Sequence, residues 1–231
     1  MPAPQAPQTI VFIHTVSFLV EEFKKRMAEE LPAVKTRHVL NESLLQDLLA
    51  GVPTTMVYRR VVEQVLIAAD AGADLIVMTC SSTSPAVDIA RQLTTIPIIK
   101  IDDPMALSAV HAGRNIGLVC TATSTVAPST ALLRAHAGTQ DLNVTVLLES
   151  DAYDALLGGD RDLHDKIVTA AAVDLAPRVD TLVLAQASLM HLQGPISAAT
   201  ATPVLASPPL LMQELHRLLS VTPELLSEGA A

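Results

Sequence analysis

Short runs of aliphatic and β-branched residues alternate with longer amphipathic stretches along the chain. The short runs predict strands and the stretches between them predict helices, a pattern typical of α/β domains with parallel sheets. The predicted strands are Thr9–His14, Val34–Leu40, Leu75–Thr79, Ile98–Ile101, Ile116–Val119, Val144–Leu148, Leu182–Ala185 and Val204–Ala206. The predicted helices are Val20–Glu30, Met56–Ala71, Pro85–Leu93, Met105–Ala112, Pro128–Ala137, His164–Ala176 and Pro209–Leu219.

The chain also resembles itself at a constant offset. Residues 10–15 match 116–121, residues 74–82 match 180–188, and residues 96–99 match 202–205. Two similar halves predict two pseudo-symmetric lobes, each a parallel sheet flanked by helices, with an active-site cleft between them. We expect a disordered lead-in at 1–8, a first lobe at 9–108, a second lobe at 109–208, and a C-terminal helix at 209–231 that can pack back on the first lobe.

Composition narrows the class of protein. Half of the residues are apolar and 17% are charged, which favours a large buried core. A net charge of −9 argues against a nucleic-acid partner, and no apolar run predicts a membrane span. Two distant cysteines form no disulfide framework, so we expect a cytoplasmic protein. An apolar helix face that includes Val61, Val65 and Ala68 suggests a homo-oligomer.

Small polar residues gather directly after the predicted strands. In parallel sheets ligands bind at the carboxyl ends of the strands, so these residues are expected to meet in the cleft. Because the clusters contain no Lys or Arg, we expect them to bind a small carboxylate through hydroxyl and backbone N–H groups. The candidate substrate-binding residues are His14, Thr15, Ser17, Ser81, Ser82, Thr83, Thr121, Thr123, Ala187 and Ser188.

Cys80 is the candidate for covalent or acid–base chemistry. It follows a buried strand and is expected to precede a helix directly, where the positive end of the helix dipole favours a thiolate. The alternative is a small buried hydrophobic residue, as many free cysteines are. Cys120 matches His14 by the offset and is more typical of a core cysteine, whereas His14 is a candidate helper base.

The two-half layout with strand–Cys–Ser/Thr loops resembles the aspartate/glutamate racemase superfamily, which includes hydantoin racemases, maleate isomerases and arylmalonate decarboxylases. The likeness covers residues 9–219. Cys80-Ser81-Ser82 resembles the family's first Cys-Asn-Thr motif, and Ala185-Gln186-Ala187 stands where its second, Gly-Cys-Thr, is expected. The segment at 118–121 resembles a family segment that helps to bind the substrate carboxylate. His191 lies near a position where the family sometimes carries a histidine.

The resemblance implies chemistry without a cofactor or metal, in which two cysteines face each other across the substrate's α-carbon. Here Gln186 replaces the second cysteine, and an amide side chain cannot act as a general acid or base. The hypothesis is therefore racemase- or isomerase-type chemistry on a small carboxylic or amino acid by Cys80 alone, with Gln186 donating hydrogen bonds to the oxyanion. The alternatives are a one-cysteine decarboxylase or lyase, and a catalytically silent protein that binds a small acid.

Overall fold

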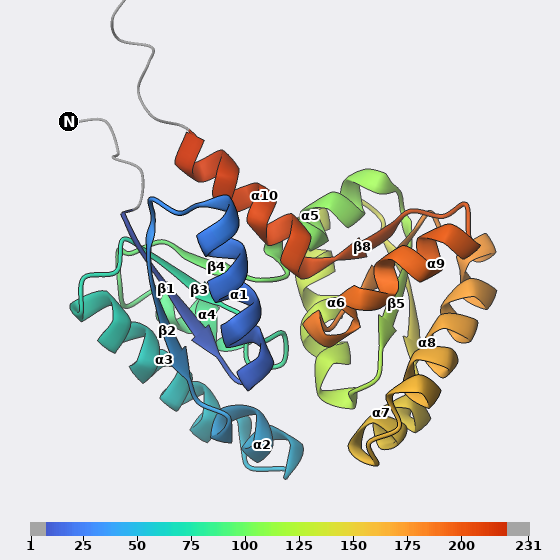
Figure 1. Ribbon diagram of the computed structural model, residues 1–231, viewed down its shortest axis with the longest axis horizontal. Coiled ribbons are helices and arrows are strands. Elements are labelled where there is room, and N and C mark those ends of the chain that lie inside the picture. Colours follow the sequence, from blue (N-terminus) through green and yellow to red (C-terminus); the bar gives the residue numbers. More distant parts are fainter. Residues whose placement is uncertain (1–7, 221–231) are drawn as a thin grey trace, which may run out of the picture.

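A computed structural model describes residues 8–220 of the chain. Two lobes lie side by side (Figure 1), each built on a parallel sheet with helices on both faces. The first lobe contains β1 (Thr9–His14), α1 (Ser17–Glu30), β2 (Lys35–Leu40), α2 (Ser43–Leu49), α3 (Thr54–Asp70), β3 (Leu75–Met78), α4 (Pro85–Ala90) and β4 (Ile98–Lys100).

The second lobe repeats this order of strands. It contains β5 (Asn115–Cys120), α6 (Thr123–Ala137), β6 (Asn143–Leu148), α7 (Ser150–Leu157), α8 (Arg161–Leu175), η1 (Ala176–Arg178), β7 (Thr181–Leu184), η2 (Ala187–Leu192), α9 (Gln193–Ala199) and β8 (Val204–Ala206). Two further helices, α5 (Asp103–Ala112) and α10 (Ser207–Ser220), follow the last strand of each sheet.

The sheets have equivalent strand orders, β2-β1-β3-β4 and β6-β5-β7-β8. The predicted two-lobe α/β fold is therefore confirmed. An equivalent contact holds the first strand of each lobe: Asp74 accepts hydrogen bonds from the N–H groups of Gln8 and Thr9, and Asp180 from those of Arg114 and Asn115. The sequence repeat at 74 and 180 thus preserves a local constraint on the strand start.

The helix that follows each sheet, α5 or α10, packs against the other lobe. Met105 and Ala109 of α5 pack in the core of the second sheet, whereas Leu211 and Leu215 of α10 pack against β1 and α1 of the first (Figure 1). The lead-in expected at 1–8 lies outside the described residues except for Gln8, as does the chain beyond residue 220.

Some expectations from the sequence are corrected. Val61, Val65 and Ala68 of α3 are buried in the core of the first lobe, so they give no support to a homo-oligomer. Cys80 does not directly precede a helix, because a turn at residues 81–84 separates it from α4. The helices α2, α7 and α9 were not expected. No helix among residues 8–220 is long and apolar enough to cross a membrane.

Candidate active site

A cavity of about 260 Å³ lies between the lobes, at the carboxyl ends of the central strands. The two central strands of each sheet end at this cavity: β1 and β3 in the first lobe, β5 and β7 in the second. Because the strands are parallel, the loops that follow them lie together. The described residues that line it are Thr15, Val16, Phe18, Leu19, Leu45, Leu49, Thr79, Cys80, Ser81, Ser82, Ala122, Ser124, Thr125, Tyr153, Leu156, Leu157, Gln186, Ala187 and Ser188.

Two helix N-termini meet the cavity, one from each lobe. Residues before and within the first turn of α1 line it, as do those of α6. The N-cap residues Val16 and Ala122 are extended and their side chains accept no capping hydrogen bond. The Ala122 carbonyl oxygen accepts from the N–H group of Thr125 at 3.1 Å, which leaves the earlier N–H groups of α6 without a side-chain cap. Unsatisfied N–H groups and the positive ends of both helix dipoles favour an anion here without a basic side chain.

Hydroxyl groups connect the lobes across the cavity. Ser82 Oγ lies 3.0 Å from Ser124 Oγ and 3.5 Å from Thr125 Oγ1, so a residue beside the Cys80 strand contacts the first turn of α6. Hydroxyl groups both donate and accept, so this bridge can rearrange when a ligand oxygen replaces one of its members. The closed end of the cavity is therefore polar and uncharged.

The open end of the cavity is apolar. Leu45 and Leu49 come from α2, and Leu156 and Leu157 from α7, the two helices that lie at the same end of their lobes (Figure 1). Phe18 of α1 completes this rim and remains 50% exposed. Exposed leucine and phenylalanine side chains grouped around a cavity are typical of a site that binds an apolar group.

Cys80 lines the cavity from the first lobe and is 7% exposed. The hydroxyl group of Thr83 donates to its carbonyl oxygen over 3.4 Å, which stabilises the turn that follows. Burial, and to a lesser degree the neighbouring Cys80, raises the pKa of Tyr58. Cys120 is different: it is fully buried, and burial raises the pKa of its thiol to about 11, so it stays protonated and inaccessible.

Gln186 lies at the equivalent place in the second lobe and has a defined orientation. Its Oε1 atom accepts from the N–H groups of Thr121 and Ala122, at 2.6 and 3.2 Å, and from the Thr121 hydroxyl group at 3.2 Å. These donors fix the oxygen toward the β5–α6 loop. Within the described part of the chain the Nε2 atom has no hydrogen-bond partner, so the amide presents free N–H donors at the cavity.

Seven of the predicted site residues line the cavity, and five do not. Those that line it are Thr15, Cys80, Ser81, Ser82, Gln186, Ala187 and Ser188. The other five are His14, Ser17, Thr83, Thr121 and Thr123, of which Thr83 and Thr121 support the loops that carry Cys80 and Gln186. Tyr153 and the apolar rim were missed because the helices α2 and α7 were not predicted.

His14 is held away from the cavity. Its Nδ1 atom is 2.9 Å from the Thr79 hydroxyl group and its Nε2 atom 2.9 Å from His38 Nδ1. Burial, followed by the charges of His38 and Lys24, lowers the pKa of His14 to about 3. The imidazole is therefore neutral near pH 7 and orients Thr79, which does line the cavity. His191 is likewise turned outward, toward Asp165 at 2.9 Å.

Comparison with known proteins places this geometry in a family. The model of the Asp/Glu/hydantoin racemase family matches residues 15–215. The chain belongs to this family. No curated protein matches the sequence.

Solved structures of racemases share the fold. An aspartate racemase from Picrophilus torridus has a TM-score of 0.71 at 14% identity, with 92% of this chain and 94% of that chain covered. An allantoin racemase from Klebsiella pneumoniae has a TM-score of 0.66 at 18% identity, covering 92% and 87%. A glutamate racemase from Aquifex pyrophilus has a TM-score of 0.65 at 18% identity, covering 90% and 83%. At these identities the likeness shows the fold, and the racemase family match supports an isomerase-type enzyme.

No three His, Cys, Asp or Glu side chains among residues 8–220 are grouped so that they could hold a metal ion. The side chains that line the cavity supply thiol, phenol, amide and hydroxyl groups.

Proposed function

We propose that the protein transfers a proton at the α-carbon of a small carboxylic acid or related carbonyl compound, using Cys80 and no cofactor. The observation that carries the proposal is the position of Cys80 beside two uncapped helix N-termini in one interlobe cavity. The thiolate removes the α-proton, and the carboxylate becomes an enediolate. The helix N–H groups and the Gln186 amide donate hydrogen bonds to its developing negative charge.

The substrate is expected to lack an ammonium group. Among the described residues that line the cavity none is charged, so an ammonium ion would be buried without a carboxylate partner. Both helix N-termini would also repel it. Aspartate and glutamate, the amino acids named in two of the related structures, are therefore poor candidates for this site. The apolar rim instead favours an acid or a hydantoin that carries an apolar substituent.

Tyr153 is the proposed proton donor on the second face of the substrate. Among the described lining residues, it and Cys80 are the two with titratable side chains, and they come from different lobes. Its hydroxyl group has no hydrogen-bond partner within residues 8–220, so it is available to a ligand. In this scheme Cys80 takes one proton, Tyr153 delivers another to the opposite face, and both groups then re-equilibrate with water.

A second candidate is decarboxylation of an α-substituted malonate. Gln186 stands where a second cysteine is expected, so protonation from one face alone is a natural outcome. Loss of carbon dioxide would leave the same enediolate, and Cys80 as the thiol would protonate it. The two uncapped helix N-termini offer one anion site for each carboxylate of such a substrate.

A panel of compounds incubated in D2O and followed by proton NMR tests the substrate class. The panel contains 5-benzylhydantoin, 2-phenylpropanoate, 2-methyl-2-phenylmalonate, maleate, and both enantiomers of aspartate and glutamate. We expect α-deuterium uptake or product formation from an apolar-substituted compound and none from the two amino acids. Faster turnover of aspartate or glutamate than of every apolar compound would reverse the substrate assignment. Binding without any turnover would favour the silent acid-binding protein.

Gln186→Glu should raise the KM of the carboxylate compound that reacts fastest by about 10- to 100-fold, because a hydrogen bond to a charged group contributes about 1.5–3 kcal/mol. The new carboxylate can still accept from Thr121 and Ala122, but its second oxygen meets the substrate as a negative charge. Gln92→Glu adds the same charge on an exposed turn after α4, outside the residues that line the cavity, and serves as the control. Equal KM values for the two variants would show that Gln186 does not contact the substrate.

A further inference from the structure

A second cavity, of about 750 Å³, is separate from the one that contains Cys80. Among residues 8–220 the two have no lining residue in common. The walls of the second cavity come from α4 and β4 of the first lobe, from α5 and α6, and from α10. Helix α6 reaches both, with Thr125 at the Cys80 cavity and His136 at the second. These two positions are about 17 Å apart along the helix, so the second cavity is not an extension of the candidate active site.

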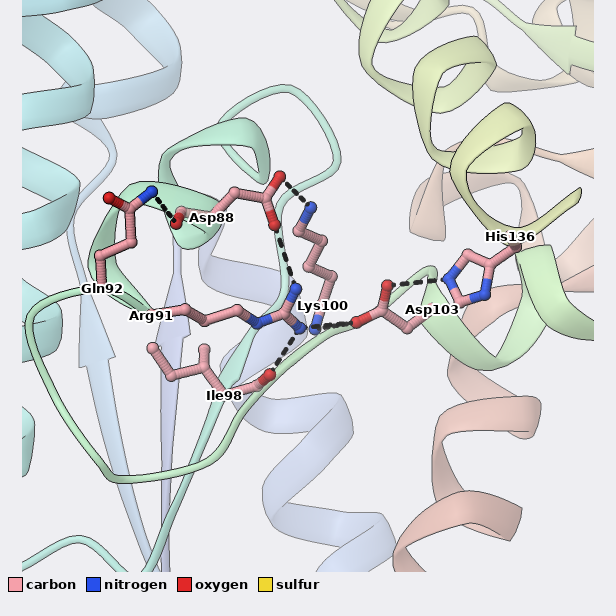
Figure 2. A network of polar contacts seen from close by, with 7 residues as sticks. All are labelled: Asp88, Arg91, Gln92, Ile98, Lys100, Asp103 and His136. Atoms are coloured by element: carbon pink, nitrogen blue, oxygen red, sulfur yellow. Dashed lines mark hydrogen bonds and ion pairs between the residues drawn. The ribbon is translucent and has the colours of Figure 1, made fainter. Parts of the chain in front are cut away.

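A network of ion pairs forms one wall of the second cavity (Figure 2). Arg91 of α4 lies 3.1 Å from Asp88 and 3.1 Å from Asp103, which begins α5. The Oδ1 atom of Asp103 lies 3.2 Å from His136 Nε2 on α6. The network thus runs from the first lobe to the second. Because Arg91, Asp103 and His136 bind one another, they shape this wall and leave ligand recognition to other side chains.

Lys100 is a charged side chain of this wall that is only partly paired. It lies in β4 and is 5% exposed, and its Nζ atom donates to Asp88 Oδ2 at 2.7 Å. An ammonium group has three N–H donors, and within residues 8–220 the Asp88 carboxylate is the one acceptor for them. The Asp88 side chain also pairs with Arg91 and is 59% exposed, so the negative partner is shared and solvated whereas the positive one is buried. A buried ammonium group with spare donors favours an anion in the cavity.

The chemistry of the other walls narrows the kind of anion. Leu107 of α5, Leu132 of α6 and Leu210 of α10 line the cavity with aliphatic surface. Three carboxylates also line it, so a dianion such as phosphate is repelled more strongly than a single carboxylate. A cavity of this size with aliphatic walls and few charged contacts is typical of sites that bind an organic molecule. Together these features favour a monocarboxylate that carries an apolar body.

We propose that the second cavity binds an apolar monocarboxylate, whose carboxylate group pairs with Lys100 and whose apolar body packs on Leu107 and Leu132. The proposal does not depend on the reaction assigned to Cys80, because none of these side chains lines the Cys80 cavity. A ligand here contacts both lobes and the helices α5 and α10 that follow the two sheets.

The test is isothermal titration calorimetry with adamantane-1-carboxylate. This probe has a compact apolar body and no α-hydrogen, so Cys80 cannot exchange a proton with it. We expect saturable binding to the wild-type protein, and binding of the neutral adamantane-1-carboxamide that is at least about 10-fold weaker. Lys100→Met keeps an unbranched buried side chain and removes the charge, so it should raise the Kd of the carboxylate by about 10- to 100-fold. No binding at about 10 mM probe, or equal Kd values for the carboxylate and the carboxamide, would overturn the proposal.

Three further variants locate the bound probe. Gln186→Glu places a negative charge in the Cys80 cavity and should leave the binding that depends on Lys100 unchanged. Leu107→Glu places the same charge in the second cavity, at a side chain that is 45% exposed, and should weaken binding about 10-fold. Leu163→Glu is the matched control, because this leucine of α8 is also 45% exposed and lines neither cavity.

The pattern across the variants decides where the probe binds. Unchanged affinity in Lys100→Met, or loss of all binding in Gln186→Glu, would place the probe in the Cys80 cavity and overturn the proposal. Equal affinity in Leu107→Glu and Leu163→Glu would also overturn it. Since both leucines are exposed, their comparison decides the matter even when Lys100→Met does not fold. Turnover by Cys80 enters none of these measurements, so a failure here is distinct from a failure of the proposed function.

Discussion

Cys80→Ser should lower the rate of α-deuterium exchange by about 10³-fold, the effect expected from removing a general base. The hydroxyl of serine occupies nearly the same volume but does not ionise near neutral pH, so it keeps the cavity and removes the thiolate. Cys80 is 7% exposed and lines the cavity from the first lobe, so the substitution changes a group at the proposed substrate site. The measurement is proton NMR in D2O with the compound that reacts fastest in the wild-type protein.

Cys120→Ala is the matched control. This second cysteine is fully buried, its thiol is held protonated by burial, and its sulfur lies 3.7 Å from the carbonyl oxygen of Leu147 rather than in the cavity. The variant should keep the wild-type exchange rate within about twofold while losing some stability from the cavity it creates. Full activity in Cys80→Ser, or loss of activity in Cys120→Ala alone, would contradict the assignment of the reaction to Cys80.

The apolar runs and the repeat in the sequence together predicted the sheets. All eight predicted strands match observed strands to within one residue at each end. Buried parallel strands are recognisable because both of their faces are apolar, so the β-branched runs stand out against the amphipathic helices. The equivalence of positions 80 and 186 then followed from topology, and both residues line the same cavity.

The residues that the sequence did not reveal belong to short helices. Leu45 and Leu49 are in α2 and Tyr153 is in α7, helices of seven and eight residues whose periodicity is too brief to predict. The open end of the cavity, and with it the proposed preference for an apolar substituent, depends on these helices and could be found only in three dimensions.

Two local environments also required the structure. His14 is at a strand end, as predicted, but it stacks with Phe12 and His38 and its ring contacts Thr79 rather than the cavity. The buried contact of Asp102 with Ser207 joins positions more than one hundred residues apart. Side-chain direction and long-range contacts of this kind leave no periodic signal in a single sequence.

Tyr153→Phe should lower the rate of inversion at the α-carbon by about 10²-fold while leaving deuterium exchange by Cys80 largely intact. Without the phenol, the proton that Cys80 removes can return only from the same face, so deuterium enters with retention of configuration. The amide of Gln186, which lies across the cavity, cannot supply a proton in its place. Chiral chromatography of the product, combined with NMR of its α-position, separates the two rates.

Tyr58→Phe is the control, since the chain has two tyrosines and this one lies near Cys80 without lining the cavity. It should change neither inversion nor exchange. If the rates of inversion and of deuterium exchange fall equally in Tyr153→Phe, the phenol contributes to substrate binding and is not the proton donor. The wild-type protein could instead exchange the α-proton or release carbon dioxide without inversion at the α-carbon. If Tyr153→Phe then behaves identically, Cys80 protonates the substrate from one face alone. The stereochemistry of a single product thus distinguishes the racemase from the decarboxylase that Gln186 makes plausible.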